Sequence, residues 1–131
     1  MHPKKLTIQG SAIHDIQSFY DEVNRVFMAD EDWQLGPSLD ALDDMLYGGY
    51  GVLFDAGNVE LHWSDIEHSR QSLGVEATRA YYLDKLAQPD RFDVARFQKA
   101  LAELDAGRGE TYFDIVMRII AEHPNVRLVT G

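Results

Sequence analysis

Strand-like and helix-like hydrophobic patterns alternate along this chain of 131 residues. Apolar and polar residues alternate over residues 5–9, 59–63 and 126–130, as they do in half-buried strands. Between the first two of these segments, apolar residues recur every three or four positions, which is typical of an amphipathic helix: Ile13, Ile16, Phe19, Tyr20, Val23, Val26 and Phe27. Three strands separated by helical segments favour parallel pairing, since each connection is long enough to cross the sheet. The order predicts an α/β fold in which a small three-stranded parallel sheet is packed with helices.

Helix-capping residues and apolar spacing predict five further helices. Ser38 is placed to cap a short helix that reaches about Tyr47, after which a run of glycines ends it. Ser64 and Glu67 form a capping-box signal for a helix toward Leu73. Apolar spacing gives the remaining three helices, over residues 75–87, 94–104 and 112–122, with breaks at Pro89, Gly107 and Gly109.

The overall composition is that of one compact domain spanning residues 1–131. Hydrophobic residues make up 45% of the chain, which is enough for a core that folds without disulfides or metals. The chain has no cysteine, so neither a disulfide framework nor a thiolate metal site is expected. Its N-terminus lacks the apolar run of a signal peptide, and no stretch approaches the roughly 20 apolar residues that span a bilayer. We therefore expect a cytoplasmic protein without membrane partners.

Negative charge is concentrated in the central third of the chain. Residues 26–69 contain no Lys or Arg but ten Asp and Glu residues, whereas the rest of the chain carries 12 basic and 12 acidic residues. The formal net charge of −10 therefore comes entirely from this segment. Such a field attracts a basic protein and repels nucleic acid, so we expect the former as a partner and not the latter. The alternative is that the acidic residues serve solubility alone.

The acidic segment includes the short helix that Ser38 begins. Three- and four-residue steps place its leucines on one face, opposite a second face of four polar side chains: Asp40, Asp43, Asp44 and Tyr47. A solvated surface, with Asp40 complementing the helix dipole, is the simplest explanation. It accounts poorly for Asp43 and Asp44, because aspartate is a weak helix former and no Lys or Arg lies at helical spacing to offset their repulsion. We therefore expect a partner to supply the counter-charge.

The sequence of this helix and of the residues before it resembles a known family. Residues 36–46 read Gly-Pro-Ser-Leu-Asp-Ala-Leu-Asp-Asp-Met-Leu, which resembles the Gly-x-x-Leu-Asp-Ala-Leu-x-Asp-x-Leu core of the barstar family. The flanks agree, because residues 4–10 resemble the family's first strand, residues 59–69 its second strand and following helix, and residues 125–131 its terminal strand. The resemblance covers roughly the first 73 and the last 20 residues. It implies the barstar fold, with residues 74–109 as a helical insertion before the last helix.

The resemblance also implies a function, which is inhibition of a basic ribonuclease by occlusion of its active site. In barstars, a loop and a short helix enter the active site, and helix carboxylates take the place of the substrate phosphate. Asp40 and Asp44 match the family's two contact aspartates, and Glu122 aligns with a further acidic contact. The expected partner-binding residues come from the loop, the helix and this last acid: Trp33, Gln34, Leu35, Gly36, Asp40, Asp43, Asp44, Tyr47 and Glu122.

Three features depart from the family pattern. Asp43 stands where the type protein has tryptophan, Arg118 stands where it has an acid, and residues 33–35 replace a pair of tyrosines. These departures are compatible with a target other than that of the type protein, and the fold inference does not depend on them. A second hypothesis is therefore a barstar-fold protein whose acidic face binds a basic protein other than a ribonuclease.

An enzyme would have to recruit the helix aspartates together with a histidine, as metal ligands or as acid–base groups. The five histidines lie in dissimilar contexts, and none forms a His-x-x-x-His pair, a nucleophile elbow or a phosphate-binding glycine loop. We therefore expect no catalytic residues, no metal and no cofactor. We also expect the free protein to be a monomer.

Aromatic residues divide between contact and packing roles. Trp33, Tyr47 and Tyr50 are candidates for partner contact, whereas Trp63, in a strand, is expected in the core. Five more fall at helical spacings in or next to the insertion, where packing is the expected role: Tyr81, Tyr82, Phe92, Phe97 and Phe113. The insertion itself is expected either to cover the sheet or to contribute a second interface.

Overall fold

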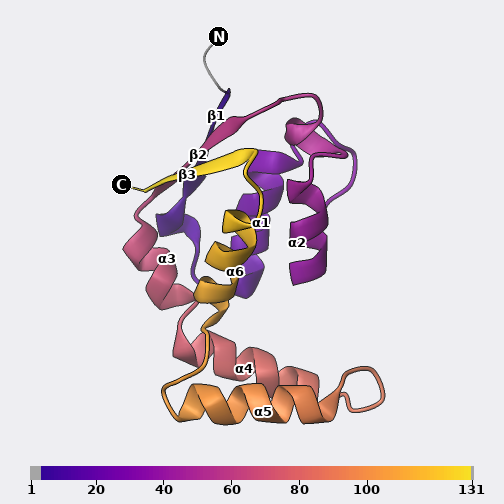
Figure 1. Cartoon of the computed structure of the whole chain (residues 1–131), viewed down its shortest axis with the longest axis vertical. Helices are drawn as coiled ribbons and strands as arrows, with labels where there is room; N and C mark the ends of the chain where they lie inside the picture. Colours follow the sequence, from indigo (N-terminus) through magenta and orange to yellow (C-terminus); the bar gives the residue numbers. More distant parts are fainter. Residues whose placement is uncertain (1–3, 131) are drawn as a thin grey trace.

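A computed structural model describes residues 4–130 of the chain. Its sheet consists of β1 (Lys4–Gln9), β2 (Val59–Ser64) and β3 (Val126–Thr130), with β2 in the middle and both pairings parallel (Figure 1). The predicted α/β fold with a three-stranded parallel sheet is confirmed. Residues 1–3 and 131, which belong to the expected N-terminal and terminal-strand segments, lie outside the described residues.

The sheet has one buried face and one exposed face. On β2, Val59, Leu61 and Trp63 are buried, and the residues between them are only partly covered. In the parallel register Leu61 lies between Leu6 and Leu128, so the equivalent side chains of all three strands point to the same side. The helices lie on this side, below the sheet in Figure 1. The opposite face is open to solvent, which is unusual for a parallel sheet.

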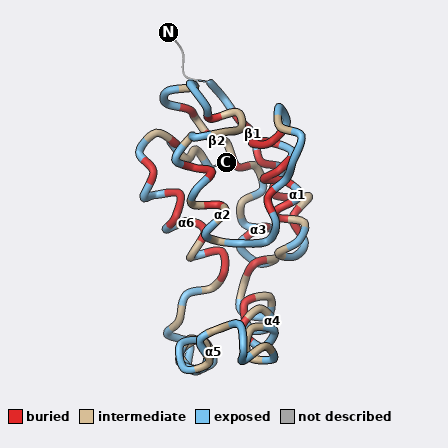
Figure 2. The backbone as a smooth tube through the Cα atoms, turned by 90° about the vertical axis from the view of Figure 1, so that its right-hand side faces the viewer, coloured by how far each residue is buried: buried red, intermediate tan, exposed pale blue. Residues whose placement is uncertain are grey.

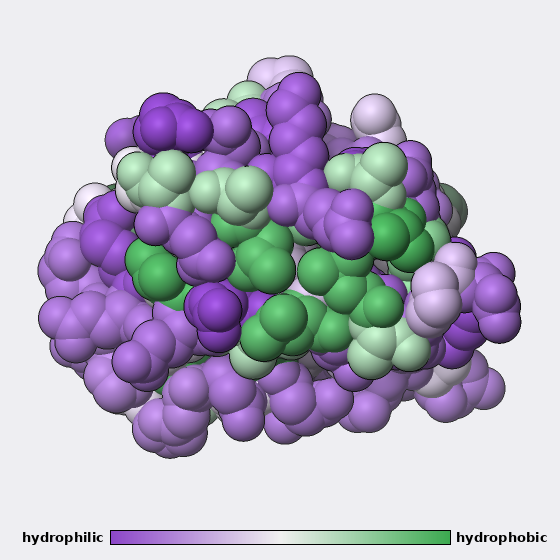
Figure 3. Space-filling view, turned by 90° about the horizontal axis from the view of Figure 1, so that it is seen from below, coloured by the Kyte–Doolittle hydropathy of each residue, from purple (hydrophilic) through white to green (hydrophobic). Residues whose placement is uncertain are grey.

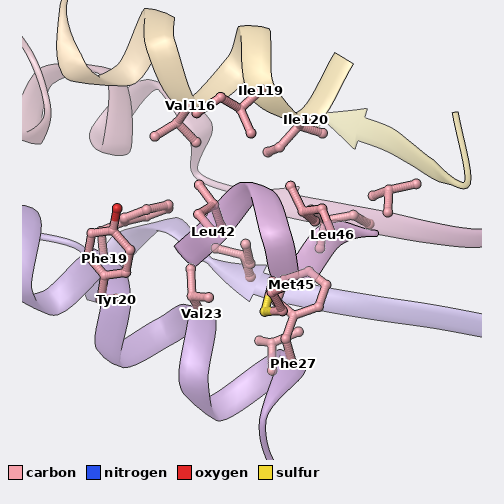
Figure 4. Packing of buried hydrophobic residues seen from close by; sticks show 14 of the residues in the cluster. Phe19, Tyr20, Val23, Phe27, Leu42, Met45, Leu46, Val116, Ile119 and Ile120 are labelled. Atoms are coloured by element: carbon pink, nitrogen blue, oxygen red, sulfur yellow. The ribbon is translucent and has the colours of Figure 1, made fainter. Parts of the chain in front are cut away.

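Three helices form the core with the buried face of the sheet. They are α1 (Ile16–Phe27), α2 (Leu39–Leu46) and α6 (Tyr112–Ala121). Figure 4 shows the side chains that these helices turn toward one another: Phe19, Tyr20, Val23, Phe27, Leu42, Met45, Leu46, Val116, Ile119 and Ile120. Full burial of such a side chain contributes about 1.5–3 kcal/mol. The core therefore fixes the orientation of α2 and turns the opposite face of this helix outward.

The first helix begins at Ile16, three residues later than the apolar spacing indicates. A 3-10 turn, η1 (Gly10–Ala12), comes first, and Asp15 then caps α1 by accepting a hydrogen bond from the Ser18 N–H at 2.8 Å. Gly10 permits this turn, because a Cβ at that position would lie 2.2 Å from the carbonyl oxygen of Ser64. The spacing misplaces the start of the helix because the residues of the turn and of the helix face the same core.

The predicted capping box at Ser64 is wrong. Ser64 is the last residue of β2, and its hydroxyl donates to the carbonyl oxygen of Ile8 at 3.3 Å. Helix α3 (Ile66–Ser72) instead follows Asp65, which has φ of 50° and makes no side-chain cap. A left-handed residue turns the chain sharply here, so the strand runs directly into the helix and leaves no place for a capping serine.

The expected insertion, residues 74–109, forms a helical hairpin of α4 (Val75–Leu86) and α5 (Val94–Asp105). The hairpin lies at the end of the helical layer that is farthest from the sheet (Figures 1 and 2). It therefore does not cover the sheet, and the second interface stays a prediction. Figure 3 views this end of the molecule and shows apolar side chains gathered among polar ones. Val75 and Leu83 of α4 are among the large apolar residues that are exposed.

Contacts with Tyr112 at the start of α6 hold the hairpin, and Tyr112 is itself bonded to α1. The hydroxyl of Thr78 on α4 accepts a hydrogen bond from the Tyr112 N–H at 2.6 Å. The phenol of Tyr112 bonds to the phenol of Tyr20 at 2.7 Å, and burial raises the pKa of both groups, so both stay protonated. Tyr81 packs edge-on against Tyr112, with ring centroids 5.2 Å apart. Because these polar groups are buried and satisfied, they favour one orientation of the hairpin.

Candidate partner-binding face

Helix α2 is built as its sequence predicts. The Ser38 hydroxyl accepts a hydrogen bond from the Ala41 N–H at 3.2 Å, so the predicted N-cap is confirmed. Leu42, Met45 and Leu46 are buried in the core, and the helix ends at Leu46 with Tyr47 as its C-cap. Its remaining positions carry the aspartates, so the capped start and the apolar stripe together set which carboxylates reach the surface.

Two of the three helix aspartates are exposed and unpaired. Asp40 and Asp44 lie four residues apart on α2, and both side chains are exposed. Among residues 4–130, no Lys, Arg or His lies within ion-pair distance of either carboxylate. Partial burial raises the pKa of the Tyr50 phenol, and the negative charge of Asp44 raises this pKa further. The two positions therefore present uncompensated negative charge to solvent.

Asp43 differs from its neighbours, because it has a partner within the chain. The Nε2 of His123 lies 2.6 Å from Oδ1 of Asp43, and His123 is only 3% exposed. Asp43 is 36% exposed, and the ring of Tyr47 stands edge-on to the imidazole at 4.6 Å between centroids. The expectation was that no Lys or Arg lies at helical spacing to offset Asp43, and the partner found here is a histidine outside that spacing. The contact joins residues 80 positions apart, so the helical spacing that we searched for cations could not reveal it.

The loop before α2 presents some of its predicted contact residues and buries one. Gln34 and Gly36 are exposed, and Trp33 packs on Tyr50 with ring centroids 4.9 Å apart. Leu35 is only 7% exposed, so its predicted role as a side-chain contact is corrected to a core role. Its backbone N–H donates to Oδ1 of Asn24 at 2.8 Å, and its carbonyl accepts from Nδ2 of Asn24 at 3.0 Å. These bonds satisfy a buried amide and anchor the loop.

Two aromatic side chains are exposed in the segment between α2 and β2. Tyr47 is 73% exposed at the end of α2, and Phe54 is 60% exposed after the 3-10 turn η2 (Gly51–Leu53). The turn is tied to the loop before α2, because Glu31 accepts a hydrogen bond from the Gly51 N–H at 3.0 Å. Sequence reasoning missed Phe54. Its position in the acidic segment, in a glycine-rich stretch between α2 and β2, was the available signal.

Glu122, the last predicted contact, is exposed at the end of α6. Its carboxylate lies 3.9 Å from Arg118, one helical turn earlier. Arg118 is engaged more closely by Glu110, at 3.0 Å, and this hydrogen-bonded carboxylate raises the pKa of the guanidinium. The departure from the family pattern at Arg118 therefore leaves Glu122 only weakly neutralised. In the described part of the chain, no group of three or more His, Asp or Glu residues could hold a metal ion.

We use the name acidic face for Trp33, Gln34, Gly36, Asp40, Asp44, Tyr47 and Glu122. The face is drawn from the loop, from α2 and from the end of α6, and α2 lies along one side of the helical layer (Figure 1). No helix formed by residues 4–130 has the length and apolar character needed to cross a membrane.

Comparison with known protein families gives a match to the chain. A search of curated proteins finds no protein that matches the chain. The family model described as Barstar (barnase inhibitor) matches residues 4–103, which include β1, β2 and the whole of α2. The match runs into α5, through most of the segment that we expected to be an insertion, and ends before α6 and β3. It covers more than half of the chain and agrees with the parallel sheet, so the protein belongs to the Barstar (barnase inhibitor) family.

Proposed function

We propose that this protein binds a basic ribonuclease and occludes its active site with the acidic face. The observation that carries the proposal is the pair of exposed carboxylates on α2, Asp40 and Asp44, which have no cationic partner among residues 4–130. Both occupy positions at which the family resemblance places contact aspartates. A ribonuclease holds the phosphates of RNA with cationic side chains, so two carboxylates one helical turn apart compete for the same groups.

The rest of the acidic face suits this role. Aromatic side chains are common at the centre of interfaces, and Tyr47 and Trp33 of the acidic face are exposed. Asp43 contributes less to binding, because its carboxylate is already engaged by His123. An inhibitor of this kind acts where the RNA of the producing cell must be protected, and we therefore place it in the cytosol. It binds as a protein ligand and catalyses no reaction.

The experiment uses barnase as the probe. Hydrolysis of RNA by barnase is measured with increasing amounts of the purified full chain, and the expected result is loss of activity that is complete near equimolar protein. The double variant Asp40→Ala/Asp44→Ala is expected to inhibit poorly, whereas the matched control Asp21→Ala/Glu76→Ala loses the same charge from other exposed sites and inhibits normally. Undiminished hydrolysis at about a hundredfold excess of inhibitor, by barnase and by other basic ribonucleases titrated in the same way, contradicts the proposal.

A second candidate is binding of a basic protein that is not a ribonuclease. It is favoured by Asp43 and Arg118, which differ from the type protein at positions of the family's contact surface. This candidate predicts a complex that forms through Asp44 without loss of ribonuclease activity. Titration of barnase and other basic ribonucleases distinguishes the two, because only the first candidate requires inhibition.

A further inference from the structure

A groove runs between the start of α2 and the α4–α5 hairpin. It has a volume of 650 Å³, which is in the usual range for ligand sites. Asp40 lies in one wall, and the opposite wall carries Tyr81, Lys85, Phe92 and Arg96 from the hairpin. The acidic face therefore continues into this groove at Asp40. None of the roles considered so far uses it.

Three cations of the groove lie over aromatic rings. The Nζ of Lys85 is 4.2 Å from the ring centroid of Phe92, and the guanidinium carbon of Arg91 is 5.4 Å from the same centroid. The guanidinium carbon of Arg96 is 5.7 Å from the ring centroid of Phe97. Such contacts orient a cation and attract it weakly, and they leave its full charge in place.

These three cations are not neutralised within the described part of the chain. No ion pair between residues 4–130 involves Lys85, Arg91 or Arg96. Two of the three acids that line the groove already have partners. Glu110 binds Arg118, and Asp93 caps α5 by accepting a hydrogen bond from the backbone of residue 96 at 3.1 Å. Four cations and three acids line the groove, so it carries a small surplus of positive charge beside a surface that is otherwise strongly negative.

We infer that the groove binds an acidic, aromatic-containing segment of the same partner protein that the acidic face engages. The inference rests on the proposed function, because continuity at Asp40 is what connects the two surfaces. Carboxylates of the segment pair with Lys85, Arg91 and Arg96, and its aromatic side chain packs on the exposed edges of Tyr81 and Phe97. Nucleic acid fits this groove poorly, since a phosphate chain leading out of it meets the acids of residues 26–69.

An interface with both signs of charge raises specificity. A basic partner with no acidic segment would satisfy Asp40 and Asp44 but leave Lys85 and Arg96 facing other cations, which is repulsive. A partner with an acidic segment next to its cationic site satisfies both surfaces. The hairpin thus forms a second contact surface of the interface. This surface discriminates among basic proteins that the acidic face alone would bind.

The test uses the full chain and a defined probe, the acetylated and amidated hexapeptide Asp-Phe-Glu-Asp-Phe-Glu. The peptide is titrated into isotope-labelled protein, and backbone amide shifts are followed by NMR. Shifts are expected in residues 81–97, with an affinity that falls about fivefold in Lys85→Gln/Arg96→Gln. The matched control Lys99→Gln/Arg108→Gln removes the same charge from hairpin positions outside the groove and is expected to bind normally.

Two further arms separate this inference from its alternatives and from the proposed function. Asp44→Ala is expected to bind the peptide normally while failing to inhibit barnase. Peptide binding therefore tests the groove, and inhibition of barnase tests α2 separately. The uncharged peptide Asn-Phe-Gln-Asn-Phe-Gln is expected not to bind. The inference is overturned if the acidic peptide does not bind, if it binds the groove variant and wild type equally, or if hexauridylate binds the groove more tightly than the peptide.

Discussion

The side chain of Asp44 is exposed in the middle of α2, where aspartate is a poor helix former. Replacing it with alanine should preserve the fold and raise the free energy of unfolding by up to about 0.5 kcal/mol, since the substitution improves helix propensity and relieves repulsion with Asp40. In the complex the same change leaves partner cations buried without a counter-charge. We expect a loss of about 2–5 kcal/mol in binding, mostly as faster dissociation.

The measurement combines urea unfolding with surface binding to barnase. Asp21→Ala serves as the control, because it removes an exposed aspartate from α1 and changes the net charge equally. Unchanged binding by Asp44→Ala would mean that the contact mode taken from the family is wrong. Unfolding of Asp44→Ala would mean that this side chain supports the fold.

Asp43 should behave in the opposite way, because it satisfies a buried histidine. Asp43→Ala leaves Nε2 of His123 without its partner, which should lower the free energy of unfolding by about 1–3 kcal/mol. Its effect on partner binding should be smaller than that of Asp44→Ala. The measurement is a double-mutant cycle in urea with His123→Phe, in which no polar atom remains to be satisfied. An equal cost of Asp43→Ala in both backgrounds would contradict the role assigned to this hydrogen bond.

At the scale of single elements, α2 was predictable because everything that defines it is local. The Ser38 cap, the apolar stripe and the exposure of Asp40 and Asp44 all follow from three- and four-residue spacing. The contact of Asp43 with His123 and the anchoring of Leu35 by Asn24 were not predictable in this way. Each depends on how distant elements pack, and a spacing pattern within one helix or loop carries no information about that packing.

The contact between α1 and β1 at Glu22 predicts that the stability of the protein depends on pH. Glu22 is nearly buried and accepts hydrogen bonds from the side chain of Arg25 at 2.7 Å and from the Gln9 N–H at 2.9 Å. These bonds, that with Arg25 foremost, hold the pKa of Glu22 below its ordinary value of 4.5. A depressed folded-state pKa stabilises the protein above the ordinary value, and the stabilisation is lost as the pH falls through the folded-state pKa.

Glu22→Gln should therefore lower the free energy of unfolding at pH 7 by about 1–3 kcal/mol, because the buried partners lose a charged acceptor. Below the ordinary pKa of 4.5 the difference between variant and wild type should shrink, since wild type loses the same charge. Urea unfolding at a series of pH values measures this. Glu67→Gln, on an exposed i,i+3 pair of α3, is the control and should show little effect at any pH. A difference that stays constant down to pH 3 would contradict the assignment.

At the scale of the whole molecule, the order of strands and helices was enough to predict the sheet. Each strand alternates, and each connection is long enough to cross over, so parallel pairing follows. The place of the α4–α5 hairpin was not predictable. Helix α4 carries apolar side chains on its inner side at Tyr82 and exposed ones at Leu83, so its sequence does not indicate which face meets the body. Buried contacts through Thr78 and Tyr112 determine its place, and only the folded chain brings these residues together.

The charge asymmetry of the whole chain yields the last prediction, which concerns the rate of association. The net charge of −10 comes from residues 26–69, the segment that contains α2, so a basic partner is attracted toward the acidic face before contact. Screening acts over about 10 Å at 0.1 M salt. Stopped-flow binding to barnase should therefore show an association rate that falls steeply between low salt and 0.5 M, while the dissociation rate changes little. With increasing salt, the association rate of Asp40→Ala/Asp44→Ala should fall less steeply than that of the control Asp21→Ala/Glu76→Ala, because the control keeps the charges at the contact. An association rate that is independent of salt would exclude steering by this segment.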